Sequence, residues 1–324
     1  MARKSSLSAD LTDTMYNSRS WPYVSHVEGT NRIIEHVEKY VCPTITSADL
    51  TGQPAFTFQP DDRPRAVFVI GEDEYQTEKT LPAFANSELE PLGVRCTYVI
   101  ADPRTPHDFK GIEALRDADL MVLSVRRRAP TAEQMSIIRK YLESGKPVVG
   151  MRTACHAFDT RGKAPEEHAE WPSFDPDVLG GHYTGHHANE LKPKVIMAKG
   201  AESHPIMAGV RTPFTGQGSL YKTGPLAASA RALLLGEIAS HPVEPVAWVN
   251  LVGSSRVFYT SLDHPGDFDN AAFCRMLRNA VFWAMNRQPS GGPSSISTSR
   301  SRFKITGADF DGNAFSHGNR VFSW

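Results

Sequence analysis

The chain has 324 residues, of which 40% are hydrophobic and 22% charged, as is typical of a soluble globular protein. The formal net charge of -1 supplies no electrostatic attraction to nucleic acid or to an anionic membrane, so we expect neither as a partner. The four cysteines lie without CxxC spacing, which argues against a zinc or disulfide framework and fits a reducing compartment.

The N-terminal segment has no apolar core of the kind found in signal peptides, and no apolar run is long enough to span a membrane. We therefore expect a cytoplasmic protein, although a chain whose signal peptide had been removed would look the same. Residues 1–63 are predicted to form an irregular N-terminal extension with one short amphipathic helix at 31–41. Residues 288–324, rich in Ser, Gly and Pro, are predicted to be a flexible tail.

Between these ends, residues 64–287 alternate between apolar runs and amphipathic segments. Thr131 and Gln134 form a capping-box pattern that predicts the start of a helix, and Gly145 predicts its end. The alternation of strands and helices predicts an α/β domain with a mostly parallel sheet covered on both faces. Strands are expected at 65–71, 94–100, 118–125, 146–151, 194–198, 231–238, 244–251 and 255–262, and helices at 77–91, from Thr131 and at 270–286.

Charged residues and histidines follow four of the predicted strands. Because ligands bind at the carboxyl ends of parallel strands, we expect these residues to share one site rather than to be unrelated solvated charges. The fourth strand runs into "GMRTACHAF" (150–158), which has the form of a tight turn before a helix. The candidates after the strands are Glu72, Glu74, Arg127, Arg152, Thr153, His156 and His264.

A glycine-rich loop, "GGHYTGHHANE" (180–190), adds His182, His186 and His187. Three glycines make a helix unfavourable there, so the spacing of the histidines does not by itself predict a metal site. Structural or substrate hydrogen bonding, acid–base chemistry and metal ligation stay open for these side chains. We predict no metal and no cofactor.

Several segments together resemble the ThuA-like, trehalose-utilisation family of the class I glutamine-amidotransferase-like superfamily. They are "GMRTACHAF", "GGHYTGHH", "SHPIMAGV" (203–210), "GSLYK" (218–222) and the stretch 245–287, and the resemblance spans about residues 65 to 287. It implies a flavodoxin-like sheet and a role in the catabolism of trehalose or a related sugar, keto-sugars included. The superfamily's glutaminases carry a Gly-x-Cys-x-Gly turn, where this chain has Arg152 at the cysteine position.

Arginine stays protonated at any useful pH and cannot act as a nucleophile, so glutamine amidotransferase activity is not expected. We predict a sugar isomerase, lyase or hydrolase in which His264, Arg152, Glu74 and His186 are catalytic. Glu72, Arg127, Thr153, His156, His182 and His187 are predicted to bind the sugar. A non-catalytic sugar-binding or regulatory module, and a cysteine hydrolase using Cys155, are the alternatives. The expected partner is a small sugar, and homo-oligomer formation is left open.

Overall fold

A nine-stranded sheet organises the domain, in the order β2-β1-β3-β4-β11-β10-β9-β6-β7. The structure, a computed structural model, describes residues 63–287, so the predicted helix at 31–41 and the predicted tail lie outside it. The strands of the sheet are β1 (Arg65–Gly71), β2 (Arg95–Ile100), β3 (Leu120–Val125), β4 (Val148–Met151), β6 (Lys194–Met197), β7 (Phe214–Thr215), β9 (Arg231–Glu237), β10 (Glu244–Val252) and β11 (Ser255–Thr260).

The sheet is mixed rather than mostly parallel. The strands from β2 to β11 in the sheet order pair in parallel, whereas every pairing from β11 outward to β7 is antiparallel. The turn Gly253–Ser254 lets β10 and β11 pair as a hairpin, and β6 and β9 continue the antiparallel part. The expected α/β class with a parallel core is therefore confirmed for the first part of the sheet only.

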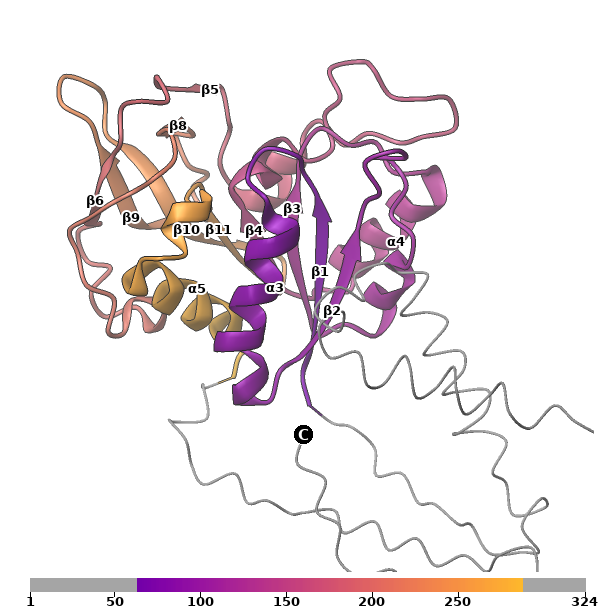
Figure 1. Cartoon of the computed structure of the whole chain (residues 1–324), viewed down its shortest axis with the longest axis horizontal. Coiled ribbons are helices and arrows are strands. Elements are labelled where there is room, and N and C mark those ends of the chain that lie inside the picture. The colour runs from indigo at the N-terminus through magenta and orange to yellow at the C-terminus, as the bar shows by residue number, and fades with distance from the viewer. Residues whose placement is uncertain (1–62, 288–324) are drawn as a thin grey trace, which may run out of the picture. The chain divides into compact units, whose positions relative to one another are not determined.

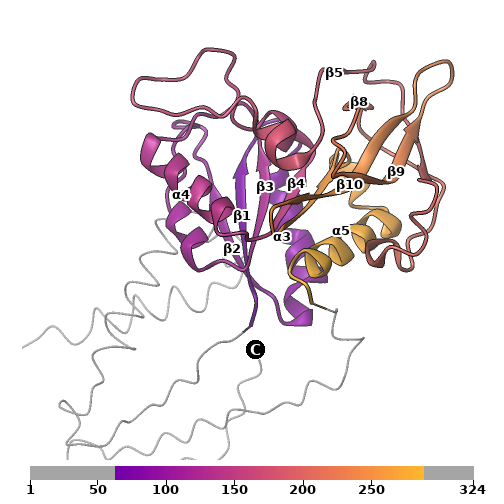
Figure 2. The ribbon, with the colours of Figure 1, turned by 180° about the vertical axis from the view of Figure 1, so that it is seen from behind.

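Helices cover both faces of the parallel part, as Figures 1 and 2 show from opposite sides. On one face, α3 (Thr77–Glu88) packs on β1 and α5 (Ala271–Ala284) packs on β4 and β11, in one core cluster with Phe68 and Ile70. On the other face, α4 (Ala132–Glu143) packs on Val67 and Val69. This alternation of buried side chains along β1 explains why that strand reads as one continuous apolar run.

The predicted capping box forms at the start of α4. Thr131 Oγ1 accepts a hydrogen bond from the backbone N–H of Gln134, and Gln134 Oε1 accepts one from the N–H of Thr131. Gly145 follows the helix with φ of 75°, the left-handed conformation that glycine adopts without strain. Within residues 63–287, no helix is both long and apolar enough to cross a membrane.

Candidate functional site

The parallel strands bring the predicted site residues to one edge of the sheet. β1, β3, β4 and β11 are consecutive neighbours and run in the same direction, so their carboxyl ends lie side by side. A non-glycine residue with positive φ follows three of these strands: Arg127 (50°), Arg152 (28°) and Asp263 (130°). Such strained residues cluster at functional sites, which supports this edge as the candidate site.

Arg152 lies at the turn after β4, with its side chain inside the protein. Its guanidinium carbon lies 4.5 Å from the ring centre of Tyr75 and 4.2 Å from that of Tyr221. Nη1 donates a hydrogen bond to the carbonyl oxygen of Ser261, and Nη2 lies 3.1 Å from Ser219 Oγ. Gly218 leaves room for the guanidinium, since a Cβ there would lie 2.8 Å from it. Arg152 therefore joins β4, β11, the 72–76 loop and the loop that carries Ser219.

The structure departs from two expectations about this turn. The catalytic role predicted for Arg152 requires contact with substrate, but the residue is only 1% exposed. A helix was expected next, but only a five-residue 3-10 turn follows, η4 (Arg152–His156), which has no appreciable helix dipole. Among the described residues, Arg152 forms no ion pair with Glu72 or Glu74, and Glu74 pairs with Arg126 instead. Carbonyl oxygens and tyrosine rings surround the cation instead.

Cys155 is buried inside the same turn. Its thiol donates to the carbonyl oxygen of Arg152 at 3.2 Å and lies 3.2 Å from His156 Nδ1. Burial raises the pKa of this thiol well above its usual value, and the nearby Asp175 raises it further. A protonated, buried thiol is a poor nucleophile, as expected for a small core residue. Thr153 is also buried, and its Oγ1 has no hydrogen-bond partner among residues 63–287.

The acidic candidates are engaged in internal contacts. Glu72 accepts hydrogen bonds from the backbone N–H groups of Glu74, Tyr75 and Thr77 at 2.6, 2.7 and 2.9 Å, so it fixes the loop before α3. Glu74 forms a 2.6 Å ion pair with Arg126. While these contacts persist, Glu74 is not free for its predicted catalytic role and Glu72 is not free to bind the sugar.

Aromatic side chains connect the histidines to Arg152. The His156 ring lies 4.6 Å from Tyr183, which lies 4.6 Å from Tyr221. Tyr183 and Tyr221 were missed as site residues from the sequence, although both lie in the quoted segments "GGHY" and "GSLYK". Together with Tyr75, they form an aromatic surface of the kind that lines small-molecule sites.

The ring of His264 lies 6.3 Å from that of Tyr75, one of the two tyrosines beside the Arg152 guanidinium. Its Nδ1 accepts a hydrogen bond from the N–H of Gly266 at 3.2 Å, which assigns the ring proton of the neutral form to Nε2. Burial lowers the pKa of His264, so the ring is neutral at pH 7. Asp267 holds the turn by accepting from the N–H groups of Asp263 (3.0 Å) and His264 (2.9 Å).

The glycine-rich loop carries the other three histidines. His186 lies on β5 (Gly185–His186), which pairs with β8 (Tyr221–Lys222), and its ring is 6.3 Å from Tyr221. Its Nδ1 donates to the carbonyl oxygen of His187 at 2.7 Å, which leaves Nε2 as a proton acceptor. His182 is exposed, and the buried His187 packs at 4.6 Å on His241, so neither belongs to the aromatic surface. Among the described residues, no three His, Cys, Asp or Glu side chains are grouped as a metal-ligand set.

Asp263 is a buried carboxyl group at the end of β11. Neither side-chain oxygen has a hydrogen-bond partner among residues 63–287, and the residue is 1% exposed. Burial raises its pKa well above the usual value, nearby Glu72 raises it further, and Arg152 opposes the shift. The group is therefore a neutral acid over part of the pH range in which most aspartates are ionised.

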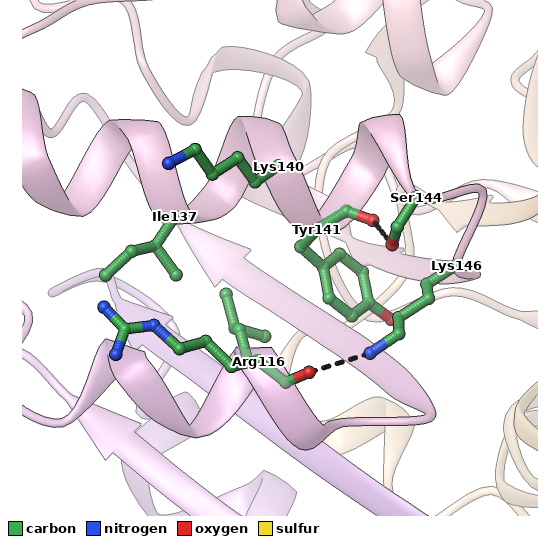
Figure 3. A pocket seen from close by; sticks show the side chains of 7 residues that line it. Arg116, Ile137, Lys140, Tyr141, Ser144 and Lys146 are labelled. Atoms are coloured by element: carbon green, nitrogen blue, oxygen red, sulfur yellow. Dashed lines mark hydrogen bonds between the residues drawn. The ribbon is translucent and has the colours of Figure 1, made fainter.

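A separate hollow of about 260 Å³ lies at the opposite edge of the sheet, before β3 and β4 (Figure 3). None of the predicted site residues lines it. Lys146 crosses one side, where its Nζ donates to the carbonyl oxygen of Arg116 at 3.0 Å. The side chains of Arg116, Ile137, Lys140 and Tyr141 form the other walls.

The fold and this edge define an α/β protein in which a buried arginine occupies the turn after a central parallel strand. The profile of one family, ThuA, described as trehalose utilisation, matches residues 65–284, and the chain belongs to this family. Two solved ThuA-like proteins share the fold at 16% sequence identity. The one from Bacteroides uniformis has a TM-score of 0.51 and covers 72% of this chain and 98% of its own. The one from Parabacteroides merdae has a TM-score of 0.50, with 72% and 94% covered. No curated protein matches the chain significantly.

Proposed function

We propose that the chain processes a carbohydrate, trehalose or a related sugar that includes keto-sugars, by acid–base chemistry without a cysteine nucleophile. The family description supports the substrate class. The observation that carries the mechanism is the contrast between the buried, protonated Cys155 and the neutral His264 at the carboxyl edge of the sheet. The flavodoxin-like, glutamine-amidotransferase-like form of the fold belongs to this proposal, with Arg152 in the nucleophile position.

The tautomers give the two histidines different roles. His264 is neutral and offers its Nε2–H as a hydrogen-bond donor that polarises a sugar oxygen, whereas His186 offers an unprotonated Nε2 and acts as the base. The His264 ring lies near Tyr75 and the His186 ring near Tyr221, so the two rings are proposed to act on different atoms of the ligand. Arg152 positions Tyr75 and Tyr221 between them. Polarisation of one ligand atom and proton removal at another suit isomerisation, elimination or hydrolysis.

The test is an NMR screen of the purified full chain against trehalose, other disaccharides and their 3-keto derivatives. For a converted sugar, His264→Asn should lower turnover by about 100- to 10,000-fold, the usual contribution of general acid–base catalysis. Asparagine still offers an acceptor to the N–H of Gly266, so the turn should survive. Cys155→Ala should leave turnover within about twofold. An inactive Cys155→Ala beside an active His264→Asn would contradict the mechanism.

A non-catalytic sugar-binding module is the second candidate. It is favoured by the internal contacts of Glu72 and Glu74, which leave few free carboxylates at this edge. In that case a sugar should bind with the same Kd to wild type and His264→Asn, and NMR should detect no product.

A further inference from the structure

Four arginine side chains lie on the β3 side of the candidate site, and we call Arg126, Arg127, Arg128 and Arg161 the arginine cluster. The first three form the turn after β3, which is joined to η4 because the N–H of Arg127 donates to the carbonyl oxygen of His156 at 3.0 Å. Arg127 reaches the 159–170 loop, where its Nη1 lies 3.1 Å from the carbonyl oxygen of Asp159. The backbone N–H of Arg161 donates to Asp159 Oδ1 at 2.8 Å.

The cluster holds more positive charge than its partners neutralise. Arg126 and Arg128 share Asp73 at 3.8 and 3.4 Å, and Arg127 lies 3.5 Å from Asp159 Oδ2. The guanidinium of Arg161 forms no ion pair with the described residues, and its residue is exposed. The partner carboxylates are Asp73, Glu74 and Asp159, so three acids face four guanidinium groups.

The excess of positive charge contributes to the lowered pKa of His156. It lies 8% exposed beside the cluster, with its ring on Tyr183. Burial lowers its pKa to about 3, with further contributions from Arg127, Arg126, Arg152 and Arg161. The ring is neutral at pH 7, and Nε2 has no hydrogen-bond partner within residues 63–287. In the tautomer that carries its proton on Nε2, the neutral ring can donate a hydrogen bond to an oxygen of an anionic ligand beside the unpaired Arg161.

We propose that the arginine cluster, with His156 and Tyr183, binds a carboxylate or phosphate group carried by the sugar, so that the ligand is an anionic carbohydrate. This inference rests on the proposed carbohydrate function. The planar guanidinium groups match the oxygens of either anion, and Tyr183 offers a ring face to the sugar. A neutral disaccharide would leave the charge of Arg161 without a partner.

The experiment compares the Kd values of the full chain for glucose, glucuronate, glucose 6-phosphate and inorganic phosphate by calorimetry at low and high salt. We expect an anionic sugar to bind about tenfold or more tightly than glucose at low salt, since charge-assisted hydrogen bonds are the strong ones. The advantage should shrink at high salt because the cluster is partly exposed. The tighter of the two anionic sugars identifies the group as carboxylate or phosphate.

Three variants locate the anion. Arg161→Gln removes an exposed charge that has no ion pair in the described part, and should raise the Kd for the anionic sugar by about threefold. Arg127→Gln should raise this Kd by about tenfold or more. Arg127→Lys keeps the charge and should raise it by less. Arg116→Gln, an exposed arginine at the opposite edge, is the matched control and should change nothing.

The outcomes separate this inference from the proposed function. Glucose binding as tightly as both anionic sugars would overturn the anion site and leave the carbohydrate function standing. Phosphate binding as tightly as the anionic sugars, with the losses in Arg161→Gln and Arg127→Gln, would support the anion site and contradict the carbohydrate function. No binding of any probe would contradict both. Equal losses in Arg116→Gln and Arg161→Gln would also overturn the site.

Discussion

Replacing Arg152 by alanine is expected to lower the free energy of unfolding by about 3–5 kcal/mol, because a large buried side chain and several hydrogen bonds are lost together. Ser261 and Ser219 would lose their donor, and the rings of Tyr75 and Tyr221 would face a cavity. For a domain of this size the melting temperature should fall by roughly 6–20 °C. Calorimetry of the purified variants measures the change.

Arg116→Ala is the control, since that side chain is exposed and such substitutions usually stay within about 0.5 kcal/mol. Arg152→Lys keeps the charge but loses the planar stacking and the forked donors. Its loss of unfolding free energy should therefore lie between those of Arg152→Ala and Arg116→Ala. A melting temperature for Arg152→Ala equal to that of Arg116→Ala would contradict a structural role for the cation. Activity has to be compared per folded molecule, because unfolding alone lowers apparent turnover.

Asp263→Asn is expected to gain stability relative to wild type as the pH rises. Because the pKa of Asp263 is raised, the folded protein binds more protons than the unfolded chain between the ordinary aspartate pKa and the raised one. Wild-type stability therefore falls as the pH increases through that window, and asparagine removes this contribution. The charged groups that act on Asp263 are Glu72, Arg152 and Asp267, from three different segments.

Urea unfolding at pH 5 and pH 8 tests this expectation. From pH 5 to pH 8, the free energy of unfolding of Asp263→Asn should rise by about 1–3 kcal/mol relative to that of wild type. This is the usual cost of an unsatisfied buried polar group. Asp267→Asn is the contrasting variant, since that carboxylate accepts three backbone hydrogen bonds and its loss should destabilise the protein at both pH values. A constant difference between Asp263→Asn and wild type would show that Asp263 is ionised throughout.

The parts of the fold that depend on local patterns were predictable from the sequence. Strand β1 matches the predicted 65–71 because both of its faces are buried, and α4 begins where Thr131 and Gln134 form their capping box. The antiparallel part was missed because strand direction depends on which strands pair, and an apolar run such as 231–238 has the same appearance in either direction.

The sequence predicted which residues meet at the carboxyl edge of the sheet, but not the contacts that they make there. The rule that ligands bind at carboxyl strand ends placed Arg152 and His264 at one edge, and Tyr75 indeed lies between them. The burial of Arg152 was not foreseen, because its partners Ser219, Tyr221 and Ser261 lie more than sixty residues away in the sequence. No local pattern signals that a cation will be enclosed by such distant groups.

Asp267 couples the motions of two loops at this edge of the sheet. One carboxylate accepts hydrogen bonds from the N–H groups of Gln217, Asp263 and His264, at 2.8, 3.0 and 2.9 Å. The three amides belong to two separate loops, yet none can be released to solvent without breaking its bond to the same side chain. Hydrogen exchange at the three positions should thus follow one opening event, in which the loop beside Arg152 and the turn of His264 loosen together.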